Sequence, residues 1–207
     1  MSTAPISTLI LEDDPDHADL LKLALSRLPE LAFDTVHCST IAEADAMTVR
    51  RNFDVVFADY WLGGETCESF LDLLRTRGGS PAVVVTTSAN DEYVAASVTR
   101  AGAHRYLRKT DLSGPLLVDA LRDAMRQSRN AKREDAEHSD ARAALADLTP
   151  REHEVAHLIA QGLPSKQIAQ RLGCAEGTVS QHRSNIIAKT KAGSVADLVR
   201  IVIRAGG

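Results

Sequence analysis

The chain has 207 residues and a net charge of −4, and 44% of its residues are hydrophobic and 25% are charged. These values are typical of one or two ordinary globular domains and argue against a disordered or fibrous protein. The apolar runs fall far short of the roughly 20 residues that a membrane-spanning helix needs, and no basic segment followed by an apolar one opens the chain, so we expect a cytoplasmic protein without membrane contact.

Short apolar runs alternate with amphipathic helical patterns over residues 1–125. The apolar runs predict five strands, at Ile6–Leu11, Phe33–His37, Phe53–Ala58, Ala82–Thr86 and His104–Arg108. The amphipathic patterns predict helices near 15–28, 40–51, 65–77, 91–101 and from 114 onward. Such alternation is typical of an α/β domain in which helices cover both faces of a parallel sheet.

The rest of the chain is predicted to be purely helical. Residues 126–147 contain neither Gly nor Pro, and their Ala, Arg and Glu content favours a charged, helical linker. Helical patterns then follow near 150–161, 165–172, 176–190 and 194–205. We therefore expect an α/β domain over 1–125, a linker over 126–147 and an all-α domain over 148–207.

The two predicted domains carry opposite charge. Residues 1–125 hold 11 lysines and arginines against 19 aspartates and glutamates, whereas residues 148–207 hold 8 against 4. This division indicates an acidic domain that faces a cation or a kinase, joined to a small basic domain suited to a polyanion.

Acidic side chains follow two of the predicted strands. Glu12, Asp13 and Asp14 come directly after the first strand, and Asp59 follows the third. In an open parallel sheet, ligands bind beyond the carboxyl ends of the strands, and carboxylates that meet there repel one another unless a divalent cation lies among them. Mg²⁺ is the natural candidate, because it binds a few carboxylates together with water and phosphate oxygens. Each aspartate could instead be a helix or loop cap.

A cation would make Asp59 a credible nucleophile toward a phosphoryl group. Thr86 ends the fourth strand and Lys109 follows the fifth. Their hydroxyl and ammonium groups could hold the oxygens of the transferred group.

With these residues in place, the segment 6–125 resembles the receiver domain of two-component response regulators, whose five parallel strands have the order 2-1-3-4-5. The resemblance implies that Asp59 accepts the phosphoryl group. It also implies that Glu12 and Asp13 are the acidic pair, with Asp13 the direct Mg²⁺ ligand, and that the backbone carbonyl of Trp61 completes the metal shell.

The same resemblance assigns the switch of the domain. Thr86 would be the switch hydroxyl, Lys109 the lysine of the site, and Tyr106 the aromatic residue that moves inward when Thr86 engages phosphate. Tyr106 could equally be an ordinary edge-strand aromatic. Three positions depart from the family pattern: Thr110 and Gly63, where Pro is frequent, and Cys67, where Gly is common.

The carboxyl-terminal domain contains two short helices joined by a turn at Gly173, which predicts a helix-turn-helix. Val179 and Ile186 mark the inward face of its second helix. The exposed candidates for DNA contact are, for base edges, Ser180, Gln181, Ser184 and Asn185, and for phosphates, Lys166, Arg183, Lys189 and Lys191. On charge alone, a solvated basic face explains these residues equally well.

The stretch from Leu148 to Arg204 resembles the LuxR-type DNA-binding domain of FixJ/NarL-like regulators. The resemblance is carried by Thr149-Pro150-Arg151-Glu152, Glu154-Val155, Gln161-Gly162, Lys166, Ile168-Ala169, Thr178-Val179, His182 and Lys189. It implies binding to double-stranded promoter DNA, with a homodimer contact through the last helix.

Together, the resemblances imply a FixJ/NarL-family response regulator in which a sensor histidine kinase phosphorylates Asp59 and so controls DNA binding and transcription. Such a protein is no enzyme beyond slow self-dephosphorylation. One alternative is a DNA-binding regulator that works without phosphorylation and uses its receiver for dimerisation. Another is a phosphohydrolase with Asp59 as nucleophile, which is opposed by Trp61 standing where a second acid is needed.

Overall fold

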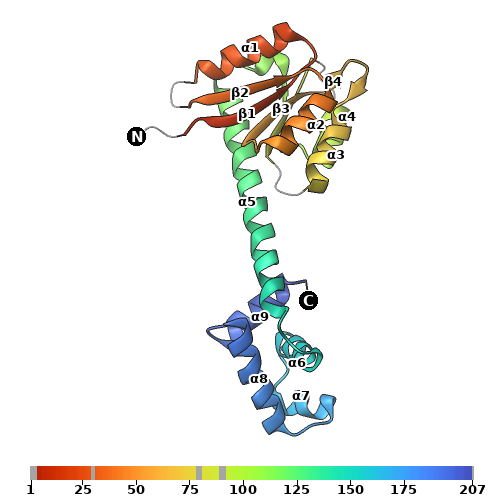
Figure 1. The fold of residues 1–207 in the computed structure, drawn as a ribbon, viewed down its shortest axis with the longest axis vertical. Coiled ribbons are helices and arrows are strands. Elements are labelled where there is room, and N and C mark those ends of the chain that lie inside the picture. Colours follow the sequence, from red (N-terminus) through yellow and green to blue (C-terminus); the bar gives the residue numbers. More distant parts are fainter. Residues whose placement is uncertain (1–3, 29–30, 78–80, 89–91, 207) are drawn as a thin grey trace. The chain divides into compact units, whose positions relative to one another are not determined.

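The structure is a computed structural model that describes residues 4–28, 31–77, 81–88 and 92–206. It divides into two compact units, Met1–Lys132 and Arg133–Gly207 (Figure 1). Helix α5 (Pro115–Leu145) begins in the first unit and ends in the second. In the part of the chain that is described, no helix has both the length and the apolar character to cross a bilayer.

The first unit is built on a five-stranded parallel sheet. Its strands are β1 (Ile6–Leu11), β2 (Phe33–Cys38), β3 (Val55–Asp59), β6 (Ala82–Thr87) and β7 (Arg105–Arg108). They are ordered β2-β1-β3-β6-β7, which confirms the predicted topology. The register pairs Leu11 with Ala58 and Asp59 with Thr86, so the carboxyl ends of the three central strands lie side by side.

Helices cover both faces of this sheet, as predicted. They are α1 (Pro15–Ser26), α2 (Ile41–Arg50), α3 (Glu68–Arg77), α4 (Glu92–Ala101) and α5. Successive residues of β3 point to opposite faces: Val55 and Phe57 pack in the core under α1 and α5, and Val56 and Ala58 pack in the core under α2, α3 and α4. Burial on both faces explains why this strand is apolar nearly throughout.

The largest differences from the sequence-based expectation lie around β3 and α3. Strand β3 begins at Val55 rather than Phe53, and helix α3 begins at Glu68 rather than near residue 65. The residues before α3 instead form a hairpin of β4 (Trp61–Leu62) and β5 (Glu65–Thr66). Its two-residue turn is Gly63-Gly64, with φ of 60° and 106°, and glycine adopts such angles without the strain that a side chain would bring. The predicted helix start at residue 91 lies outside the described residues.

The second unit is all helical and contains the predicted helix-turn-helix. Its helices are α6 (Pro150–Ala160), α7 (Ser165–Leu172), α8 (Glu176–Thr190) and α9 (Val195–Arg204). Helix α7 is followed by its cap residue Gly173, whose left-handed φ of 64° makes the tight turn toward α8. Leu145, at the end of α5, belongs to the same buried core as Val179 and Ile186. The last turns of α5 therefore fold as part of this unit.

Candidate functional site

Three carboxylates gather at the carboxyl edge of the sheet. Glu12 and Asp13 follow β1, and Asp59 ends the neighbouring β3, so that one oxygen of each lies within 4.8 Å of the others. Glu12 and Asp59 are 5% and 7% exposed, whereas Asp13 is open to solvent. Carboxylates this close repel one another unless a cation neutralises them. A set of oxygen donors that is partly open to water fits Mg²⁺, which keeps several waters when it binds.

Lys109 supplies a cation of the protein's own to this cluster. It opens the 3-10 helix η1 (Lys109–Asp111) directly after β7, and its Nζ lies 2.8 Å from Glu12 Oε2 and 2.9 Å from Asp59 Oδ2. Burial disfavours the ammonium form, but the hydrogen bonds to Glu12 and Asp59 outweigh it and raise the pKa of Lys109 above its ordinary value. For Glu12, burial disfavours the charged carboxylate and so raises the pKa, although the hydrogen bond from Lys109 opposes that change.

The predicted switch residues lie on the strands beyond Asp59. Thr86 is 2% exposed, stands beside Asp59 in the register, and donates a hydrogen bond to the carbonyl oxygen of Ala58 over 3.4 Å. Tyr106, on β7, pairs with Val85 of β6 and is half-buried against the core under α4. Trp61 lies in β4, two residues after Asp59, and 55% of it is exposed.

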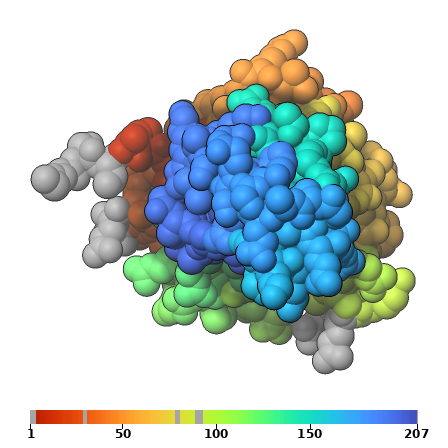
Figure 2. Space-filling view, turned by 90° about the horizontal axis from the view of Figure 1, so that it is seen from below, coloured from red at the N-terminus to blue at the C-terminus, as the bar shows by residue number. Residues whose placement is uncertain are grey.

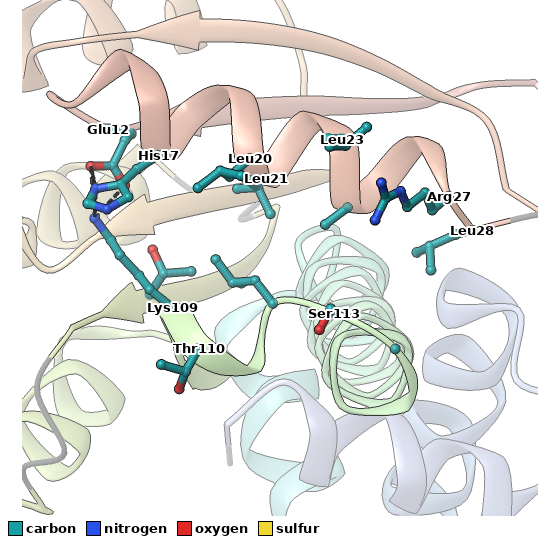
Figure 3. A pocket seen from close by; sticks show the side chains of 14 residues that line it. Glu12, His17, Leu20, Leu21, Leu23, Arg27, Leu28, Lys109, Thr110 and Ser113 are labelled. Atoms are coloured by element: carbon teal, nitrogen blue, oxygen red, sulfur yellow. Dashed lines mark hydrogen bonds and ion pairs between the residues drawn. The ribbon is translucent and has the colours of Figure 1, made fainter.

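Asp14 and His17 lie next to the acidic cluster and make contacts of different kinds. Asp14 is the N-cap of α1, where its carboxylate accepts a hydrogen bond from the backbone N–H of Asp16. The cap interpretation therefore describes Asp14, whereas Asp13 Oδ2 reaches across to the backbone N–H of Gly63 at 2.9 Å. His17, for which no sequence pattern indicated a role, places Nδ1 at 3.1 Å from Lys109 Nζ (Figure 3).

Helix α8 presents a polar face in the second unit. The surface formed by α7 and α8 is coloured blue in Figure 2. Val179 and Ile186 are buried, and the four residues predicted to reach base edges are all exposed: Ser180, Gln181, Ser184 and Asn185. Gln181 donates to Asn185 Oδ1 over 3.1 Å, one helical turn away. Side chains of this kind can read base edges in a major groove.

The predicted phosphate contacts differ in how far they are already engaged. Lys166 and Lys191 are exposed on the surface. Arg183 is half-buried and donates to Ser165 Oγ at 2.9 Å, which ties α8 to the start of α7. Lys189 Nζ lies 2.7 Å from Glu152 Oε2, and 36% of the Lys189 side chain is exposed. Lys189 therefore links α8 to α6, and its ammonium group still has N–H donors that do not point at Glu152.

Glu152 completes a capping box at the start of α6. Its side chain accepts a hydrogen bond from the backbone N–H of Thr149, and its own backbone N–H donates to Thr149 Oγ1. The hydrogen bonds from Lys189 and Thr149 lower the pKa of Glu152 to about 2. Proton linkage then makes the stability of this unit depend on pH.

We expect the second unit to lose stability on acidification through Glu152. The pKa of Glu152 is about 2 in the folded chain and 4.5 for a glutamate without these partners. Its contribution to the free energy of unfolding is therefore complete above pH 4.5 and disappears as the pH falls toward 2. In the full-length chain at neutral pH, Glu152→Gln should lower the urea concentration at which α6 and α8 are half unfolded. It should also make this midpoint depend less on pH in the acid range. Hydrogen exchange of peptides from these helices measures both effects.

Glu154→Gln is the matched control, since Glu154 lies on the same helix and pairs with Arg151, and both of these side chains are more than 40% exposed. Exposed ion pairs contribute little to stability. Equal effects of the two substitutions would contradict the role assigned to Glu152.

Comparison with known proteins places both units. The family model for the response regulator receiver domain matches residues 8–122, and that for bacterial regulatory proteins of the luxR family matches residues 146–202. The transcriptional regulatory protein FixJ of Azorhizobium caulinodans is 31% identical, covering 83% of this chain and 81% of its own. The nitrate/nitrite response regulator protein NarL of Escherichia coli is 29% identical over 90% of both chains. The solved structure of the response regulator StyR aligns with 97% of this chain and 100% of its own, with a TM-score of 0.67 and 24% identity.

Proposed function

The chain belongs to the FixJ/NarL family of two-component response regulators, with a receiver and a LuxR-type DNA-binding domain, and we propose that phosphorylation of Asp59 by a sensor histidine kinase controls its binding to promoter DNA. The observation that carries this proposal is the placement of Asp59. Its carboxylate lies against Lys109 Nζ at 2.9 Å, in register with Thr86 and within 4.8 Å of two further carboxylates.

In the proposed transfer, a carboxylate oxygen of Asp59 attacks the phosphorus of a phosphohistidine. The new P–O bond forms as the P–N bond breaks, and the imidazole leaves with the bonding electron pair. Lys109 and Thr86 lie where they can donate hydrogen bonds to the transferred oxygens. Mg²⁺ held by Glu12, Asp13, Asp59 and the carbonyl of Trp61 would neutralise the charge of the phosphoryl group.

The acyl phosphate would act by shifting a population. Thr86 would turn from the carbonyl oxygen of Ala58 toward the phosphoryl group, and the half-buried Tyr106 would follow into the space behind it. Carrying an equilibrium from 1:99 to 99:1 takes roughly 5.5 kcal/mol of differential stabilisation. Several charge-assisted hydrogen bonds to the phosphoryl oxygens supply energies of that order.

The output of the switch would be binding of α8 to the major groove. Ser180, Gln181, Ser184 and Asn185 would face base edges. Lys166, Arg183 and Lys189 would contact phosphates, which gives affinity and salt dependence rather than sequence choice. A homodimer would double this small set of contacts and match two half-sites. The receiver would comprise 1–125 and the DNA-binding domain 148–207, joined by the linker 126–147, whose last turns pack in the core of the second unit. The protein would work in the cytoplasm, where the DNA is.

Beryllofluoride, a mimic of the phosphoryl group, tests this proposal on the full-length protein. Duplexes are first selected from a random-sequence pool by retention on protein treated with Mg²⁺ and beryllofluoride. We expect the affinity for the selected duplexes to be at least about tenfold higher with the mimic than without it, a difference of about 1.4 kcal/mol.

Two results would contradict the proposal. Equal affinity with and without beryllofluoride would indicate a regulator that binds DNA without phosphorylation and uses its receiver for dimerisation. Repeated turnover of p-nitrophenyl phosphate would indicate a phosphohydrolase, whereas the proposed protein does no more than release its own acyl phosphate slowly.

A further inference from the structure

His17 is the histidine of α1 that lies against the site. Its Nδ1 is 3.1 Å from Lys109 Nζ, 3.2 Å from Asp14 Oδ2 and 3.7 Å from Glu12 Oε1. The imidazole also lines a cavity of about 410 Å³ between α1 and the segment that follows β7, and Figure 3 shows it next to Lys109 and Glu12. The side chain of His17 is 41% exposed, against 12% for that of Lys109.

These distances bear on which ring nitrogen of a neutral His17 carries the proton. An ammonium group can only donate hydrogen bonds, so a proton on Nδ1 would set two donors against each other across 3.1 Å. Lys109 is nearly buried and its other near neighbours are Glu12 and Asp59, whereas Asp14 is 47% exposed and can bind water. Leaving the buried ammonium without a partner is the more costly arrangement. This difference favours Nδ1 as the acceptor, with the proton of the neutral ring on Nε2.

The three protons of the Lys109 ammonium thus have three acceptors: Glu12, Asp59 and His17. Glu12 and Asp59 belong to the carboxylate cluster that fits a divalent cation, so a cation would compete with Lys109 for their oxygens. His17 is the acceptor that stands outside this cluster. Its bond to Lys109 can persist when the carboxylates turn to a cation.

We propose that His17 is a positioning residue, which holds the Lys109 ammonium through Nδ1 so that it points at the phosphoryl group on Asp59. This role rests on the proposed function of Asp59. It assigns His17 to phosphoryl binding and not to metal binding, because the imidazole acts on Lys109 and the carboxylates bind the cation.

The first test reads the tautomer of His17 in the unphosphorylated protein without Mg²⁺. The ¹⁵N spectrum of histidine-labelled full-length protein is recorded at about pH 8, where histidines with ordinary pKa values are neutral. His17→Asn identifies the His17 signals by their loss. We expect an unprotonated Nδ1 whose resonance moves in Lys109→Arg and stays in place in Asp14→Asn. A protonated Nδ1, or a shift that follows Asp14 instead, would overturn the proposal.

The second test separates phosphoryl binding from metal binding. Fluorescence of Trp61, the single tryptophan of the chain, is the readout chosen for both ligands. His17→Ala should weaken beryllofluoride binding in saturating Mg²⁺ about tenfold, as expected for one hydrogen bond to a charged group, and change Mg²⁺ affinity by less than about twofold. His17→Asn should restore most of the loss, because its Oδ1 replaces the Nδ1 acceptor.

A purely structural role of His17 would give a different pattern. His17→Asn would then fail to rescue, or both affinities would fall by the same factor, and either result would refute the positioning role. If the wild-type protein formed no acyl phosphate at all, the proposed function of Asp59 would fail, whereas the tautomer measured without ligands would still decide the contact between His17 and Lys109.

Discussion

We expect Asp59→Asn to abolish labelling of the protein by acetyl phosphate. A neutral amide has no carboxylate oxygen to attack phosphorus, so we expect incorporation to fall at least about 100-fold, to background. The substitution keeps the shape of a side chain that is only 9% exposed, and it removes one negative charge from a crowded acidic cluster. The variant should therefore remain folded. The measurement is radiolabel released by hydroxylamine, which cleaves acyl phosphates.

Asp54→Asn provides the matched control for this experiment. Asp54 lies just before the opposite end of β3, where its carboxylate accepts a hydrogen bond from the backbone N–H of Ser7 at 2.9 Å. We expect this variant to be labelled like the wild type. Persistent hydroxylamine-sensitive label on Asp59→Asn would identify another acceptor and remove Asp59 from its proposed role.

The architecture of the first unit was predictable because its signals are local. Strands such as β3 are apolar on both faces, and helices such as α1 begin at a proline that follows an aspartate cap. Once the strands are parallel, their carboxyl ends share one edge, which is why Glu12 and Asp59 could be expected to meet. The roles given to individual residues there came from the family resemblance rather than from the pattern.

Very short strands and contacts between distant segments could not be predicted from the sequence. The β4 and β5 strands have two residues each, too few for alternation to show, although Gly63-Gly64 is a recognisable turn signal. The contact of His17 with Lys109 spans 92 residues. The contact of Lys189 with Glu152 depends on how α8 crosses α6, so the sequence alone indicated only an exposed cation at Lys189.

Asp13→Asn should weaken Mg²⁺ binding at least about tenfold, because Mg²⁺ depends on its few carboxylate ligands. Glu12 and Asp59 are both bound by Lys109, so an incoming cation must displace that ammonium from their oxygens. Asp13 is exposed, and among the described residues no cationic side chain pairs with it. Asn keeps an oxygen that can accept from the N–H of Gly63, so the loop is preserved and the charge alone is lost. Trp61 fluorescence against Mg²⁺ concentration measures the change.

The neighbouring substitution Asp14→Asn separates this effect from general loss of negative charge. Asn is as good an N-cap as Asp, so α1 should be unchanged and Mg²⁺ affinity should stay within about twofold. Equal losses in the two variants would show that Mg²⁺ responds to the overall field and not to Asp13 as a ligand. If Asp13 is a ligand, labelling of Asp59 in Asp13→Asn should be slow at low Mg²⁺ and recover as Mg²⁺ is raised, since the nucleophile and Lys109 are intact.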